Sequence, residues 1–85
     1  MDYRYRPMGV CSTEMIFDID EQTKKVNDLK VINGCNGNLK GISALIKEMN
    51  IDEIIEKLEG IKCGFKNTSC PDQIAKALRE FKIDN

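Results

Sequence analysis

Four cysteines are the residues of this 85-residue chain best suited to chemistry: Cys11, Cys35, Cys63 and Cys70. The sequence contains no histidine, which removes Cys–His and Ser–His nucleophilic arrangements and leaves thiolates, carboxylates and backbone groups as metal ligands. The intervening stretches of 23, 27 and 6 residues include no C-x-x-C, so the spacing is less specific than that of a zinc ribbon. All four nevertheless lie at boundaries between expected elements, where side chains from separate segments can converge.

We keep three explanations for these four thiols. The first is a shared metal site, holding zinc or an iron–sulfur cluster through all four cysteines. The second is a redox pair in which Cys63 and Cys70 cycle between dithiol and disulfide. The third is simple packing, above all for Cys11 and Cys35, because free cysteine is among the most buried residue types.

The first residues of the sequence indicate whether the cysteines belong in a reducing or an oxidising compartment. Met1 to Pro7 is polar and basic and lacks the apolar segment of a signal peptide. We therefore expect a cytoplasmic protein, in which the cysteines are free, redox-active or metal-bound rather than structural crosslinks.

The stretch Thr68 to Gln73 predicts a helix start that carries a cysteine. Ser69 can accept from the first free backbone N–H groups, Pro71 suits the first turn, and Asp72 suits the positive end of the helix dipole. Cys70 then lies where a thiolate is favoured. We assign no residue a catalytic role.

A second junction surrounds Cys35, where several turn-forming residues lead from an expected strand into an expected helix. Backbone N–H groups at such a junction can bind an anion or a nucleotide phosphate. The alternative is a tight turn, because neither G-x-G-x-x-G nor the Walker pattern is present. The candidate residues for anion binding are Gly34, Gly37, Asn38 and Gly41.

Hydrophobic periodicity predicts an α+β fold. Alternating apolar residues over 12–19 and 26–32 indicate an antiparallel β-hairpin. Apolar residues at helical spacing then predict three short helices packed on one face of the hairpin, beginning near Gly37 or Asn38, after Asn50, and near Cys70. Residues 1–9 are expected to be a loosely attached arm, or to supply a third strand, within a single domain of residues 1–85.

The charge pattern narrows the range of partners. The net charge is −1 and both signs are mixed along the chain, so we expect no nucleic-acid binding and no membrane binding. A two-stranded hairpin is marginal alone. A second copy of the chain could therefore cover it, so a homodimer without chemistry is a further alternative.

The cysteines occur in four motifs whose order and spacing resemble the TSCPD domain family from about Tyr5 to Phe81. This family occurs as small stand-alone bacterial proteins and as a C-terminal module of some ribonucleotide reductases, notably cobalamin-dependent ones. Two stretches depart from the family pattern, Asn33-Gly34 and Glu48-Met49-Asn50, and neither contains a cysteine. The motifs are Gly9-Val10-Cys11-Ser12, Gly34-Cys35-Asn36-Gly37-Asn38-Leu39-Lys40-Gly41-Ile42-Ser43, Gly60-Ile61-Lys62-Cys63-Gly64, and Thr68-Ser69-Cys70-Pro71-Asp72-Gln73-Ile74-Ala75.

The resemblance implies that the four cysteines belong together. It also implies an association with nucleotide metabolism and DNA synthesis, with ribonucleotide reductase as a partner. Proteins of this kind share the label ribonucleoside-diphosphate reductase, but 85 residues cannot hold a nucleotide site, a radical cofactor and a reducing dithiol together. The expected function is therefore an accessory or regulatory module, not an enzyme by itself.

Overall fold

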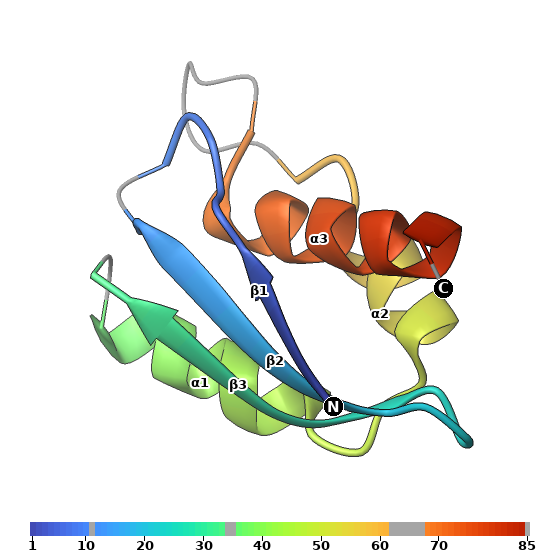
Figure 1. Cartoon of the computed structure of the whole chain (residues 1–85). Helices are drawn as coiled ribbons and strands as arrows, with labels where there is room; N and C mark the ends of the chain where they lie inside the picture. The colour runs from blue at the N-terminus through green and yellow to red at the C-terminus, as the bar shows by residue number, and fades with distance from the viewer. Residues whose placement is uncertain (11, 34–35, 62–67, 85) are drawn as a thin grey trace.

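The computed structural model describes residues 1–10, 12–33, 36–61 and 68–84. These residues form an antiparallel sheet of order β1-β2-β3 and three helices (Figure 1), which confirms the expected α+β fold. The elements are β1 (Asp2–Tyr5), β2 (Glu14–Asp20), β3 (Lys25–Ile32), α1 (Asn36–Ile46), α2 (Ile51–Leu58) and α3 (Cys70–Asp84).

One face of the sheet carries the core, as the alternating pattern predicts. Phe17 of β2 pairs with Tyr3 of β1 on one side and Leu29 of β3 on the other. Met15, Phe17 and Ile19 are fully buried, whereas the residues between them are partly exposed. Successive side chains of a strand point to opposite faces, so only one face of the sheet is packed against the helices.

The third strand is present, because Asp2–Tyr5 pairs along β2 as β1. The Tyr3 ring lies edge-on to Phe81 of α3, with 5.3 Å between ring centroids, and 6.5 Å from Phe17. Residues 2–5 are therefore part of the sheet and touch the core, and are not a loose arm.

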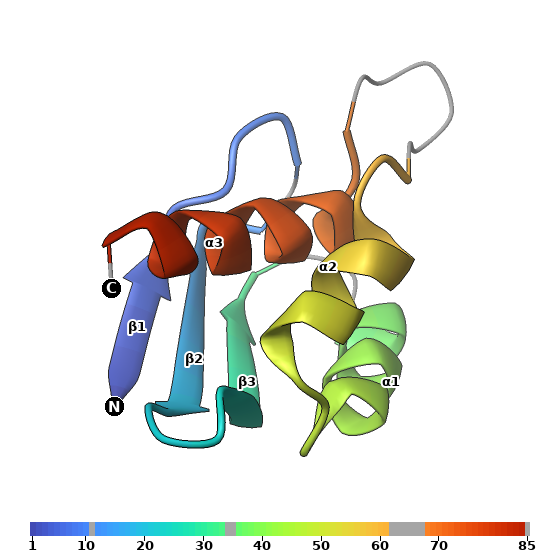
Figure 2. The ribbon, with the colours of Figure 1, turned by 90° about the vertical axis from the view of Figure 1, so that its right-hand side faces the viewer.

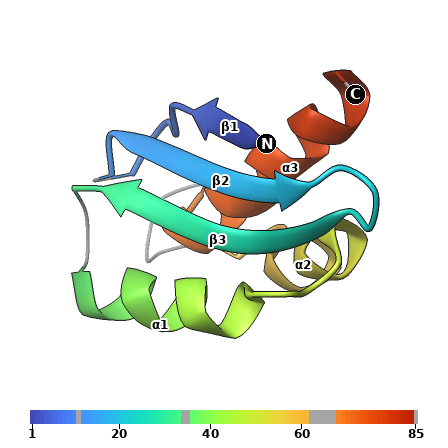
Figure 3. The same ribbon diagram turned by 60° about the horizontal axis from the view of Figure 1, so that its bottom comes forward.

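The helices cover this packed face with apolar side chains at helical spacing. Figure 2 shows α3 running across the strands with α2 beside it, and Figure 3 shows α1 lying alongside the edge strand β3. Asn50 caps α2 by accepting from the Asp52 amide at 2.9 Å, and Gly60 follows the helix with φ 87°, as expected of a C′ glycine. The helix α1 begins at Asn36, slightly before the predicted Gly37 or Asn38.

Candidate functional site

The start of α3 is organised by the side chain of Ser69. Its Oγ accepts from the Asp72 amide at 3.2 Å, and its carbonyl accepts from the Gln73 amide at 2.9 Å. The same hydroxyl donates to the carbonyl of Ile61 at 2.6 Å. This bond joins the residues that follow α2 to the start of α3. The predicted N-cap is therefore confirmed, and it also fixes both flanks of the segment 62–67.

Cys70 is the first residue of α3 and its thiol is half-buried. Pro71 follows it in the first turn, where a missing N–H costs nothing. The Sγ atom of Cys70 lies 3.8 Å from Oγ of Ser12, which is buried. This contact places Cys70 beside the residue that follows Cys11 in the sequence.

Asp72 is a buried carboxylate with three partners. It is 3% exposed and accepts from the Thr68 hydroxyl at 2.5 Å and from the Gly60 amide at 2.7 Å. The Lys76 ammonium lies 3.3 Å away. Burial alone would raise the pKa of Asp72, but these partners, the Thr68 hydroxyl foremost, hold the pKa below its ordinary value. The carboxylate is thus charged and ties together both sides of the segment 62–67.

Gln73 connects this network to the N-terminal segment. Its Oε1 accepts from the Tyr5 hydroxyl at 3.2 Å and the Met8 amide at 3.0 Å, and its Nε2 donates to the Thr68 hydroxyl at 2.9 Å. Burial and then the charge of Glu80 raise the pKa of Tyr5, so the phenol stays a donor. No buried side-chain nitrogen or oxygen of the described residues lacks a partner, so the network is fully satisfied.

Sequence reasoning found Ser69 and Asp72 through helix capping but missed the roles of Gln73, Tyr5 and Gly9. Gly9 has φ 73°, and a Cβ built on it would lie 3.1 Å from Cγ2 of Thr68. Glycine at position 9 therefore lets the chain pass close to Thr68, just before α3, in a conformation that other residues rarely adopt. No short-range pattern links residues so far apart in the sequence, so only the fold reveals these contacts.

The described neighbours of Cys11, Cys35 and Cys70 gather at one end of the molecule, and Ile61, which precedes Cys63, is bonded to Ser69 beside the start of α3. The start of β2, the end of β3, the start of α1 and the start of α3 all lie there (Figures 1 and 3). Cys11, Cys35 and Cys63 themselves lie outside the described residues. Within the described part of the chain, no group of three or more Cys, Asp or Glu side chains could hold a metal ion. The four-cysteine site and the Cys63/Cys70 redox pair therefore stay predictions.

The anion-binding prediction at the start of α1 also falls partly outside the described residues, because Gly34 is not among them. Gly37 and Asn38 lie in the first turn of α1, where N–H groups are free of intrahelical partners. Gly41 lies further along the helix, and a Cβ added there would meet nothing within 4 Å. Because Gly41 lies beyond the first turn of α1, its backbone N–H is not one of the free donors at the helix start.

The fold and the site define a small α+β domain in which a buried polar network presents a cysteine at a helix start. The family model for the TSCPD domain matches residues 1–82. The chain therefore belongs to the TSCPD domain family, which is associated with ribonucleotide reductases. No match to a curated protein or to a solved structure was found. Among the described residues, no helix is long and apolar enough to cross a bilayer.

Proposed function

We propose that this chain is a small accessory module of ribonucleotide reduction that binds a metal through Cys11, Cys35, Cys63 and Cys70. Its partner is ribonucleotide reductase or another cytoplasmic protein of nucleotide metabolism. The observation that supports the proposal is the convergence of the described segments that flank these cysteines. Ser12, next to Cys11, touches the Cys70 thiol, and Ile61, two positions before Cys63, is bonded by Ser69.

The donor set fits zinc or an iron–sulfur cluster. Four thiolates without histidine match the ligands that these groups prefer. Cys70 is the first residue of α3, so the helix start presents one of the four thiols. The Ser12 hydroxyl lies at 3.8 Å from Cys70 Sγ, where it can orient this ligand as an outer partner.

The metal, when bound, supplies folding free energy or electron transfer according to its identity. The residues of the chain hold the ligands in place. Asp72, Thr68 and Ser69 fix the helix start that presents Cys70 and both ends of the segment that carries Cys63. A chain of this size then acts on a larger partner and not as a reductase by itself.

Metal analysis of protein purified without oxygen tests the proposal. We expect roughly one zinc ion or one cluster per chain, lost in Cys70→Ser together with thermal stability. Leu45→Ser, at an exposed position of α1, is the control and should retain the metal. Less than about a tenth of an equivalent of any transition metal, with Cys→Ser variants as stable as the parent, would contradict the proposal.

The same preparation distinguishes the metal site from the thiol redox alternative. The redox alternative is supported by the position of the half-buried Cys70 thiol at a helix start. A metal-free protein that loses two free thiols on mild oxidation, but not when Cys63 or Cys70 is replaced by serine, would support thiol–disulfide exchange with a partner instead.

A further inference from the structure

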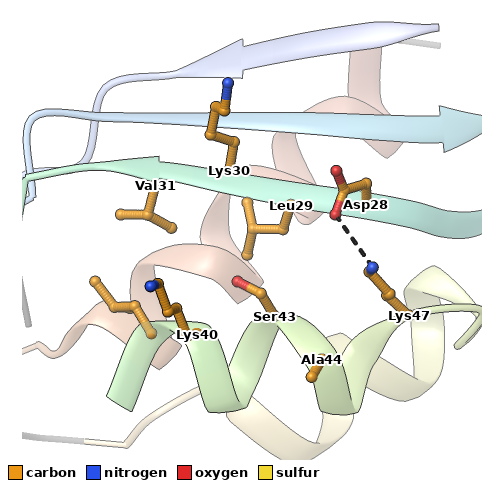
Figure 4. A pocket seen from close by; sticks show the side chains of 9 residues that line it. Asp28, Leu29, Lys30, Val31, Lys40, Ser43, Ala44 and Lys47 are labelled. Carbon is orange, nitrogen blue, oxygen red and sulfur yellow. Dashed lines mark ion pairs between the residues drawn. The ribbon is translucent and has the colours of Figure 1, made fainter. Parts of the chain in front are cut away.

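A groove of about 320 Å³ runs between β3 and α1 (Figure 4). Its strand wall consists of the four consecutive residues 28–31, so the groove follows the edge of β3 and not one face of it. Its helix wall is one stripe of α1, spaced i, i+3, i+4 and i+7. The stripe comprises Lys40, Ser43, Ala44 and Lys47.

The charged side chains that line this groove are mainly cationic. Three lysines, Lys30, Lys40 and Lys47, line it together with one carboxylate, Asp28. Lys47 lies 3.8 Å from Asp28, but both side chains are more than half exposed, so the pair contributes little and opens easily. Neither Lys30 nor Lys40 has an ion pair among the described residues. In Figure 4, Lys40 and Ser43 point from α1 toward β3, whereas Lys30 points away from α1.

The base of the groove is apolar and one end is closed. Leu29 and Leu39 line it and are each 5% exposed. Beyond the groove, the chain itself occupies the edge of β3, because the Val26 amide donates to Met49 at 3.0 Å and the Glu48 amide donates to Val26 at 2.7 Å. The strand edge is therefore not open along its whole length, which favours a small molecule over an extended peptide.

We propose that the β3–α1 groove binds a small organic anion, a phosphate or carboxylate attached to a compact apolar group. Lys40 and Ser43 hold the anionic group by charge and hydrogen bonding. Lys47 turns from Asp28 to join them, and the apolar group lies on Leu29 and Leu39. No cysteine is among the described residues that line the groove, so this site uses other side chains than the metal site proposed above.

Titration of the full chain, as purified, with phenyl phosphate, benzoate and inorganic phosphate tests the site by amide NMR. Saturable shifts centred on residues 28–31 and 40–47 are expected for phenyl phosphate or benzoate, with weaker binding of inorganic phosphate, which lacks the apolar group. The stronger of the two aromatic probes identifies the anionic group. An absence of saturable shifts at these residues for all three probes would overturn the proposal.

Two variants and a matched control keep the test specific. Lys40→Gln should weaken phenyl phosphate binding about tenfold, the loss expected for one charged hydrogen bond, and Ser43→Leu should block the groove. Lys57→Gln removes the same charge from an exposed position on α2 and should leave binding unchanged. Equal weakening in Lys40→Gln and Lys57→Gln would show general charge attraction and no site.

Discussion

At the scale of single residues, Asp72 makes the main structural contribution of the Thr-Ser-Cys-Pro-Asp motif. It joins Thr68, the Gly60 amide and Lys76, so it fixes the segment that approaches Cys70 as well as the first turn of α3. Helix capping rules predict an acid here. They do not predict the bond to Gly60, because that partner lies 12 positions earlier in the chain.

Asp72→Asn is expected to destabilise the protein by about 1–3 kcal/mol, the cost of weakening hydrogen bonds to a buried charged group. Urea unfolding followed by circular dichroism measures this loss. Glu56→Gln, an exposed acid on α2, is the control and should change stability by less than about 0.5 kcal/mol. Similar unfolding midpoints for the two variants would refute the role given to Asp72.

The pH dependence of stability follows from the same carboxylate. The folded protein holds the pKa of Asp72 below its ordinary value. Its stabilising contribution is therefore complete above the unfolded pKa of about 3.9 and is lost as pH falls below it. Urea unfolding between neutral pH and acid should show a steeper loss for the parent than for Asp72→Asn. Parallel curves would contradict this assignment.

Two glycines provide a paired test of backbone conformation. Gly9→Ala should destabilise the protein by about 1–2 kcal/mol, because φ is 73° and the new Cβ would lie 3.1 Å from Thr68. Gly41→Ala should instead stabilise α1 by about 0.5–1 kcal/mol, since nothing lies near its Cβ position. Thermal unfolding of both variants measures the two changes in stability. A Gly9→Ala variant as stable as the parent would show that residue 9 does not pack tightly against Thr68.

At the scale of elements, α3 is held to the N-terminal segment by Gln73 and to the sheet by Phe81. Periodicity predicted the hairpin and all three helices, because each buries one apolar face. It did not decide between an arm and a strand for residues 1–9, since β1 is short and depends on contacts with β2 and Phe81. The sequence likewise identified Cys70 but not the Ser12 contact, which only the fold creates.

Gln73→Leu should loosen residues 5–8 without unfolding the helix. The Met8 amide and the Tyr5 hydroxyl both donate to Gln73, so hydrogen exchange at the Met8 amide should become faster. Tyr5→Phe removes only one of these bonds and should leave Met8 protected. Unchanged exchange at Met8 in Gln73→Leu would show that the N-terminal segment is held by other contacts.

At the scale of the whole molecule, the hydrophobic core is small, so a bound ligand would add to the stability that the core provides. A domain of 85 residues buries only a modest share of its surface, and the helices cover one face of its sheet. A metal that joins the four cysteine segments would stabilise the end of the molecule where α1 and α3 begin. The homodimer stays a prediction, and a monodisperse monomer in light scattering would contradict it.

The most direct test of the metal site is X-ray absorption at the edge of the metal that the anaerobic protein contains. A zinc-bound protein should show a shell of four sulfur neighbours at about 2.3 Å, and an iron protein should show sulfur neighbours together with iron–iron scattering. Cys70→Ser should reduce the sulfur shell or abolish metal binding. A shell of oxygen or nitrogen alone, or a spectrum unchanged in Cys70→Ser, would contradict the four-cysteine site.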